Sequence, residues 1–219
     1  MRFVVLLLIA TSAAAQPSAP RAPEGWAWSL DGPANLSAGG KAIGTDSLFE
    51  FALMAPGWHL TMGPGAVVHD PRETADHRFW LTAELILFPD ASIQGEYGIF
   101  VGGKALDGGT KQWYAFVVRG DGSAAVMHRA GPDTHTVMPW TKHAAVKARP
   151  ADATVTNVVQ LRAEPDSIRF LVNGQPLTAF ARSDLDVNGP FGLRVGAGVN
   201  LHVTNLDLTR RLAPFPQRR

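Results

Sequence analysis

Residues 80–88 read WLTAELILF, and this stretch determines the kind of structure that the chain can form. Side chains alternate along it with a period of two, so that Leu81, Ala83, Leu85 and Leu87 share one face. Successive side chains of an extended strand point to opposite faces, whereas a helix repeats every ~3.6 residues. The stretch therefore predicts a β-strand that buries one face.

Turn residues interrupt the same two-residue period elsewhere in the chain. Asn173-Gly174 follows an alternating run at 168–172, and Asn-Gly is typical of the type I′ turn of a β-hairpin. Gly120-Asp121-Gly122 predicts another hairpin, between residues 113–119 and 123–129. The chain is thus divided into short strands joined by tight turns.

The apolar phase changes by one residue near the C-terminal end. Val203 shares a face with the apolar residues before it, but Leu206 and Leu208 fall on the other parity. Such a shift inside a strand predicts a β-bulge, here near Thr204-Asn205. No stretch has the period of a long amphipathic helix, so the sequence predicts an all-β fold in which two antiparallel sheets form a sandwich.

The N-terminal residues predict export. Arg2 precedes a short apolar run and the small residues Ala13, Ala14 and Ala15, which is typical of a cleavable secretory signal. An ordinary buried segment is the alternative for the same run. We expect a signal peptide at 1–15, a Pro/Ala-rich spacer at 16–25, one domain at 26–212 and a tail at 213–219. The expected location is periplasmic or extracellular.

Composition restricts the partners and cofactors. The chain has no cysteine, which excludes disulfides, thiolate metal sites and a lipid anchor on a cysteine at the cleavage point. Its 20 basic and 19 acidic residues nearly balance, so nothing predicts binding of nucleic acid or of anionic lipid. No stretch after the leader is long and apolar enough to predict a membrane span.

Several segments carry a family resemblance, and they lie at residues 79–88, 97–101, 157–163, 172–174, 189–194 and 201–208. In this order they resemble the strands of concanavalin A-like jelly-roll domains. The likeness is strongest to secreted domains called DUF1080, or 3-keto-disaccharide hydrolase-like, which are related to family 16 glycoside hydrolases. The resemblance implies a jelly-roll sandwich. It implies no catalytic residues, because the E-x-D-x-x-E strand of family 16 is absent here.

Two carboxylates are candidates for catalysis. Glycosidases place two carboxyl groups on either side of the scissile bond. Glu84 and Glu96 would form such a pair if neighbouring strands placed them on one face. The alternative is that Glu84 lies on a solvated sheet face or pairs with an arginine such as Arg119.

Aromatic and planar polar side chains are candidates for sugar binding, because sugars present flat C–H faces and hydroxyl groups. The candidates are Trp58, His59, Tyr97, Trp113, Arg119, His128 and Trp140. Trp113 and Arg119 share one parity, opposite to Tyr114, Phe116 and Val118. If the latter three fill the core, Trp113 and Arg119 face outward; the alternative is a strand buried on both faces.

Residues 69–77 combine histidines and carboxylates, but their spacing fits no common metal-ligand pattern. Pro71 and Arg72 predict an exposed polar loop there. We therefore predict no metal site and no cofactor, with a structural calcium ion near Asp107 or Asp121 as an open alternative.

Together these features predict an exported, non-catalytic domain that binds a carbohydrate or glycoconjugate. Two alternatives stay open: a hydrolase or lyase that acts on 3-keto-glycosides, and a structural or protein-interaction domain of the cell envelope.

Overall fold

The structure is a computed structural model that describes residues 23–31 and 49–211. The predicted signal peptide, most of the predicted spacer and the predicted tail lie outside these ranges. All regular elements of the described residues are β-strands, which confirms the all-β prediction. Among these residues there is no helix with the length and apolar character needed to cross a membrane.

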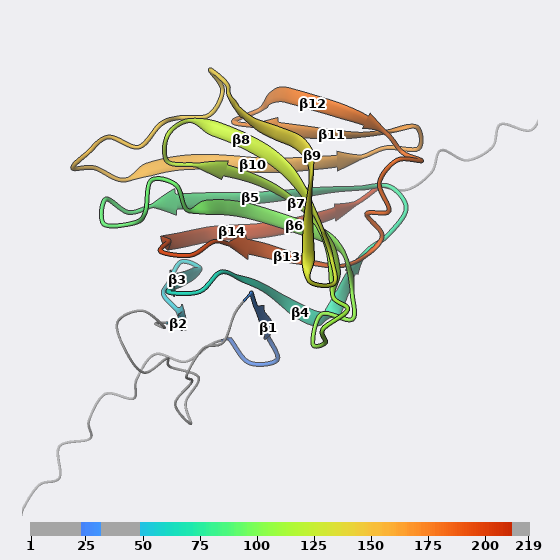
Figure 1. Cartoon of the computed structure of the whole chain (residues 1–219), viewed down its shortest axis with the longest axis horizontal. Helices are drawn as coiled ribbons and strands as arrows, with labels where there is room; N and C mark the ends of the chain where they lie inside the picture. Colours follow the sequence, from blue (N-terminus) through green and yellow to red (C-terminus); the bar gives the residue numbers. More distant parts are fainter. Residues whose placement is uncertain (1–22, 32–48, 212–219) are drawn as a thin grey trace, which may run out of the picture.

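The described strands form two antiparallel sheets of seven strands each (Figure 1). Sheet 1 consists, in neighbour order, of β1 (Ala27–Leu30), β4 (Ala66–Ala75), β13 (Gly189–Val195), β6 (Glu96–Lys104), β7 (Gln112–Arg119), β8 (Ser123–Ala130) and β9 (Asp133–Lys142). Sheet 2 consists of β12 (Gln175–Ala181), β11 (Ser167–Val172), β10 (Val155–Ala163), β5 (Phe79–Leu87), β14 (Asn200–Arg210), β3 (Trp58–Met62) and β2 (Phe49–Leu53). The predicted two-sheet sandwich is therefore confirmed.

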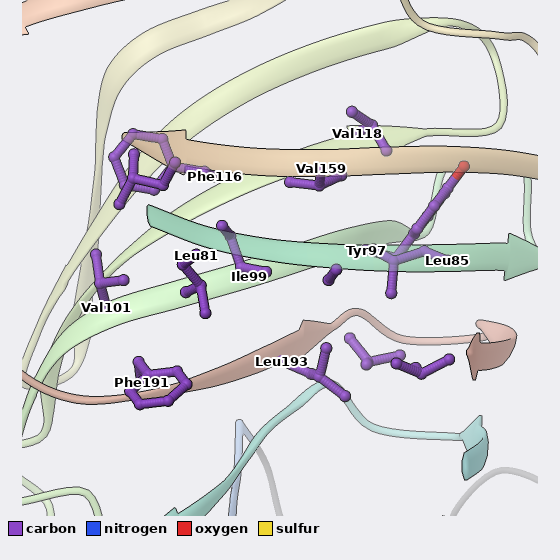
Figure 2. Close-up of a cluster of buried hydrophobic side chains, with 14 of the residues drawn as sticks. Leu81, Leu85, Tyr97, Ile99, Val101, Phe116, Val118, Val159, Phe191 and Leu193 are labelled. Carbon is purple, nitrogen blue, oxygen red and sulfur yellow. The ribbon is translucent and has the colours of Figure 1, made fainter. Parts of the chain in front are cut away.

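The core lies between the two sheets. Along β5 and β10 every second residue is buried, as the two-residue period predicts. Figure 2 shows Leu81, Leu85 and Val159 of sheet 2 near core-facing side chains of β6, β7 and β13 in sheet 1. Phe116 and Phe170 join the layers directly, with ring centroids 5.5 Å apart in an edge-to-face arrangement.

The turns and the bulge follow the sequence closely. Asn173 and Gly174 have φ angles of 51° and 77°, and a type I′ turn requires positive φ at both positions. Residues 120–122 connect β7 to β8, as predicted. The register of β14 against β5 shifts between Val203 and Asn205, which confirms the predicted bulge.

The predicted polar loop at 69–77 is largely a strand instead. β4 spans Ala66–Ala75 and pairs with both β1 and β13. His69 pairs with Gly192 and Thr74 with Pro190, so residues 70–73 bulge outward opposite a single residue of β13. The exposed polar composition reflects this bulge, which the pattern of residue types does not distinguish from a loop.

One polar side chain lies fully within the core. Asn157 is 0% exposed and uses its whole amide group. Its Nδ2 donates to the Tyr97 hydroxyl (3.1 Å) and to the Lys147 carbonyl (3.0 Å), and its Oδ1 accepts from Lys147 N and Asn173 Nδ2. This bonding connects β10 to β6 and to the turn after β11. A buried amide that makes all its hydrogen bonds does not destabilise the fold, whereas losing some of these bonds lowers the free energy of unfolding.

We therefore expect Asn157→Ala to lower the free energy of unfolding by about 3 kcal/mol, because it leaves the buried groups of Tyr97 and Lys147 without partners. Tyr97→Phe should cost only about 1 kcal/mol, because Asn157 keeps its other bonds. Urea denaturation of both variants measures the difference. Equal losses would show that the amide network is not the source of the stability.

Candidate functional site

The central strands of sheet 1 are buried on both faces. Beyond the core, a second apolar layer lies on the face that points away from sheet 2. Its buried members are Val67, Phe100, Leu106, Trp113, Ala115, Val117 and Ala125. Trp113 thus points away from the core, as its parity predicts, yet it is only 2% exposed. Both sequence interpretations of β7 are therefore correct in part. The side chain of Trp113 points away from the core, and the strand is nevertheless buried on both faces.

Charged and aromatic side chains gather on and around this second layer. We call them the charged face, which consists of Asp31, Glu96, Lys111, Trp113, Arg119, Trp140 and Arg194. They come from β6, β7, β9, β13 and the segments next to β1 and β7. Parity places Glu96, Arg119 and Arg194 on the outer side, because their strand neighbours fill the core.

Arg194 is the centre of the charged face. It is 5% exposed, and its Nη2 donates both to Asp31 Oδ2 (2.5 Å) and to Glu96 Oε1 (2.8 Å). Its guanidinium carbon lies 5.1 Å from the ring centroid of Trp113, within reach of a cation–π interaction. Burial disfavours its charge, but the two carboxylates outweigh this effect and raise the pKa of Arg194.

The two carboxylates are less buried than the arginine that holds them. The side chains of Asp31 and Glu96 are 28% and 18% exposed. Each uses one oxygen for Arg194, and the second oxygen of each accepts no hydrogen bond from the residues that the structure describes. These oxygens are fixed in position and able to accept further hydrogen bonds.

A second arginine–tryptophan pair borders the face on the other side. The guanidinium carbon of Arg119 lies 3.6 Å from the ring centroid of Trp140, and Arg119 Nη1 also donates to Gln94 Oε1 (3.5 Å). Arg119 pairs across the sheet with Glu96. Trp140 is partly exposed, and this stacking holds it beside Arg119.

Lys111 ties the β6–β7 connection to the edge strand β1. Its Nζ donates to Ser29 Oγ (3.0 Å) and to the Leu30 carbonyl (2.5 Å). Burial lowers the pKa of Lys111, although Asp31 opposes this effect. The lysine therefore helps to position the chain next to Asp31.

Several buried polar atoms on this side of sheet 1 have no hydrogen-bond partner among the residues that the structure describes. They are Trp113 Nε1, Arg194 Nε, Arg194 Nη1, Arg119 Nε and His69 Nδ1. An unpaired buried donor costs about 1–3 kcal/mol, so such atoms are uncommon in folded proteins. They are five of the nine such atoms among the described residues, so this side of sheet 1 holds just over half of them.

The structure separates the two predicted catalytic carboxylates. Glu84 lies on the outer face of sheet 2, where its backbone N–H donates to Asn205 Oδ1. Glu96 lies on the outer face of sheet 1, so the core stands between them and they cannot face each other across a sugar. The carboxylate that does approach Glu96 is Asp31, which shares Arg194 with it.

Four of the nine predicted site residues meet on the charged face: Glu96, Trp113, Arg119 and Trp140. The other ligand-binding candidates lie elsewhere. Tyr97 is buried in the core, where burial raises its pKa to about 12. Trp58 packs on Trp26 at 5.1 Å.

The two histidine candidates also lie away from the charged face. His59 contacts Phe88 on sheet 2 with ring centroids 5.4 Å apart. His128 stacks on Tyr114 at 4.3 Å, on the side of β7 and β8 that faces the core. Among the described residues no group of three or more His, Asp or Glu side chains could hold a metal ion.

Comparisons with known proteins give the fold class. No protein-family model matches the chain, and no curated protein matches its sequence. Among solved structures, a carbohydrate-binding module, CBM66, from Bacillus subtilis superposes with a TM-score of 0.59 at 11% identity, over 83% of this chain and 94% of the module. A Bacillus subtilis protein of unknown function with a galectin-like fold gives 0.59 at 11% identity, over 84% and 89%.

An alginate lyase, A1-II′, gives a TM-score of 0.53 at 13% identity, over 85% of this chain and 94% of the lyase. At these identities the likeness shows the fold and nothing more. The chain thus has the fold of a two-sheet jelly-roll sandwich, as the resemblance in the sequence implied. Membership of the DUF1080 group stays a prediction.

Three partly buried histidines predict a pH dependence of stability. Burial lowers the pKa values of His59, His69 and His128 below the ordinary value for histidine, about 6.5. Their stabilising effect is complete above the unfolded value and is lost as the pH falls from 6.5 through the folded values. We expect the free energy of unfolding to decrease on acidification below pH 6.5.

His69→Gln should make this decrease shallower, because one of the three histidines no longer takes up a proton on unfolding. Urea denaturation over a series of pH values measures the slope. His143→Gln makes the same chemical change at an exposed position and is the control for the substitution itself. A His69→Gln slope equal to that of the unaltered protein would contradict the expectation.

Proposed function

We propose that the protein is an exported domain that binds a neutral carbohydrate or glycoconjugate at the charged face and carries out no chemistry on it. The observation that carries the proposal is the placement of Asp31 and Glu96. A buried arginine holds both carboxylates, and the second oxygen of each has no hydrogen-bond partner among the described residues. The leader pattern at 1–15 supports export.

Carboxylate oxygens are acceptors for hydroxyl hydrogens, and hydrogen bonds to a charged group are stronger than neutral ones. Two such acceptors on one arginine suit a pair of neighbouring hydroxyls on a sugar ring. Because Arg194 is buried and fully engaged at Nη2, the more accessible ends of this arrangement are the carboxylates. This favours a neutral sugar over an acidic one, which the carboxylates would repel.

The aromatic side chains fit the same ligand class. Trp140 is partly exposed beside Arg119, the cross-strand partner of Glu96, and a sugar presents C–H surfaces that pack on such a ring. Arg119 stacks on Trp140 and brings further N–H donors to the rim. Support also comes from the fold, because one structural neighbour is named as a carbohydrate-binding module and another as an alginate lyase.

A glycosidase or lyase is the second candidate. Asp31 and Glu96 bind the same nitrogen atom, so their two bonded oxygens lie no farther apart than the carboxyl groups of a retaining glycosidase. However, a general acid must hold a proton, and here both groups form ion pairs with one arginine. The ion pairing favours binding without turnover. If the protein were such an enzyme, the family resemblance in the sequence would imply a 3-keto-glycoside as its substrate.

A glycan-array screen followed by calorimetry tests the proposal. We expect Glu96→Gln and Asp31→Asn each to weaken binding of the selected glycan by about tenfold or more, because a charge-assisted hydrogen bond is lost. Glu84→Gln is the matched control, since it makes the same chemical change on the outer face of sheet 2 and should leave affinity unchanged. Thermal melts confirm that all three variants are folded.

A screen that finds no glycan, or a glycan whose binding responds to Glu84→Gln rather than Glu96→Gln, would contradict the proposal. The same proteins are incubated with plain oligosaccharides and 3-keto-glycosides to test the second candidate. Turnover by the unaltered protein that Glu96→Gln abolishes would replace binding with catalysis as the function of this face.

A further inference from the structure

Four arginines gather around a tryptophan at one end of the outer face of sheet 2. We call this group the arginine patch, and it consists of Arg78, Trp80, Arg162, Arg169 and Arg211. Its members come from β5, β10 and β11 and from the residues just before β5 and just after β14, all neighbours in sheet 2 (Figure 1). The adjacent residues Phe79, Leu161 and Phe170 fill the core, so parity places the patch on the opposite side of the molecule from the charged face. All members are at least partly exposed.

Trp80 is the centre of the arginine patch. The centroid of its ring lies 4.6 Å from the guanidinium carbon of Arg162 and 4.2 Å from that of Arg211, within reach of cation–π interactions. Its Nε1 donates to Glu164 Oε1 (2.9 Å), and Glu164 Oε2 accepts from Arg78 Nε. Trp80 therefore holds two guanidinium groups in position, and both oxygens of Glu164 are already engaged.

Arg162 and Arg169 place like charges opposite each other. They form a cross-strand pair between β10 and β11, and in such pairs the Cβ atoms lie about 5 Å apart. Within the described residues, Arg162, Arg169 and Arg211 form no ion pair. Like charges directly opposite each other destabilise a sheet. An oxyanion bound by both guanidinium groups would remove this repulsion.

The next positions on the same face are neutral or acidic. Thr82 and Gln160 pair two residues further along β5 and β10, roughly 7 Å away, and Gln160 Nε2 donates to Thr82 Oγ1 (3.5 Å). Asp207 lies opposite Thr82 on β14, and Glu84 lies beyond it. A membrane presents negative charge across a whole surface, which these two carboxylates would repel. A ligand with one anionic group beside neutral hydroxyls fits this arrangement instead.

We infer that the arginine patch is a second binding site, which takes the carboxylate of an acidic sugar residue, that is, a uronic acid unit of a glycan. Arg162 and Arg169 bind the carboxylate oxygens, because the planar guanidinium group matches a carboxylate through paired N–H···O bonds. The sugar hydroxyls lie towards Thr82 and Gln160. The inference goes beyond the proposed function and is independent of it, since the two sites lie on opposite faces of the sandwich and take sugars of different charge.

The probes are D-glucuronate, D-galacturonate and D-mannuronate, each paired with its methyl ester, which keeps the sugar ring and removes the charge. In an NMR titration of the full chain, at least one uronate should cause saturable shifts that its ester does not cause. Arg162→Gln and Arg169→Gln should each weaken binding of that uronate about tenfold, because charge-assisted hydrogen bonds are lost. Arg72→Gln makes the same change at an exposed side chain of sheet 1 and should leave binding unchanged.

Three results would overturn the inference. The first is that no uronate binds, or that the esters bind as tightly as the uronates. The second is uronate binding that survives both Arg162→Gln and Arg169→Gln. The third is a membrane ligand: vesicles of phosphatidylcholine and phosphatidylglycerol that sediment the unaltered protein but not Arg169→Gln would assign the patch to a lipid surface.

Thermal melts of Arg169→Gln test the repulsion on which the inference rests. Because the substitution removes a like charge opposite Arg162, we expect an unchanged or higher Tm. A lower Tm would show that the arginine stabilises the fold and would remove the argument for an anion. Glu96→Gln, which tests the charged face, should leave uronate binding unchanged, so that each proposal can fail while the other stands.

Discussion

The alternation of side chains along β4, β6 and β7 is the constraint on which the molecule depends. Successive residues of a strand must face opposite sides, and in these strands both sides carry apolar residues. Sheet 1 consequently supports two layers, one against sheet 2 and one on its outer face. Any polar side chain within the second layer loses its contact with water, so it needs a hydrogen-bond or ion-pair partner there.

Arg194 shows how that requirement is met. Asp31, just after β1, and Glu96 of β6 form ion pairs with it and compensate its charge. The ring of Trp113 on β7 packs against its guanidinium group. Such buried ion pairs rarely add much stability over an apolar packing of the same volume. Retaining one on an otherwise apolar surface is better explained by the two oriented carboxylates that it produces.

Periodicity predicts β5, β7, β8, β11, the two principal hairpins and the bulge of β14, because these depend on local spacing. It does not predict β4, because the exposed polar residues of the bulge at 70–73 have the composition of a loop. It also placed Trp113 and Arg119 correctly on one outward parity. It could not pair Glu96 with its neighbour, because parity does not specify which strands are adjacent or which sheet holds them. Glu84 is close in sequence but lies on the other sheet, whereas Asp31 and Arg194 meet across 163 positions.

The polar character of the charged face limits what hydrogen bonding alone can add to affinity. Hydroxyl groups bound by carboxylates exchange one set of hydrogen bonds for another, so a shallow polar face alone gains little over water. Burial of apolar surface contributes a driving force that water does not offset, and Trp140 is a partly exposed aromatic ring of this face. A glycan long enough to span the face would therefore obtain orientation from Asp31 and Glu96 and an apolar contribution from packing on the ring of Trp140.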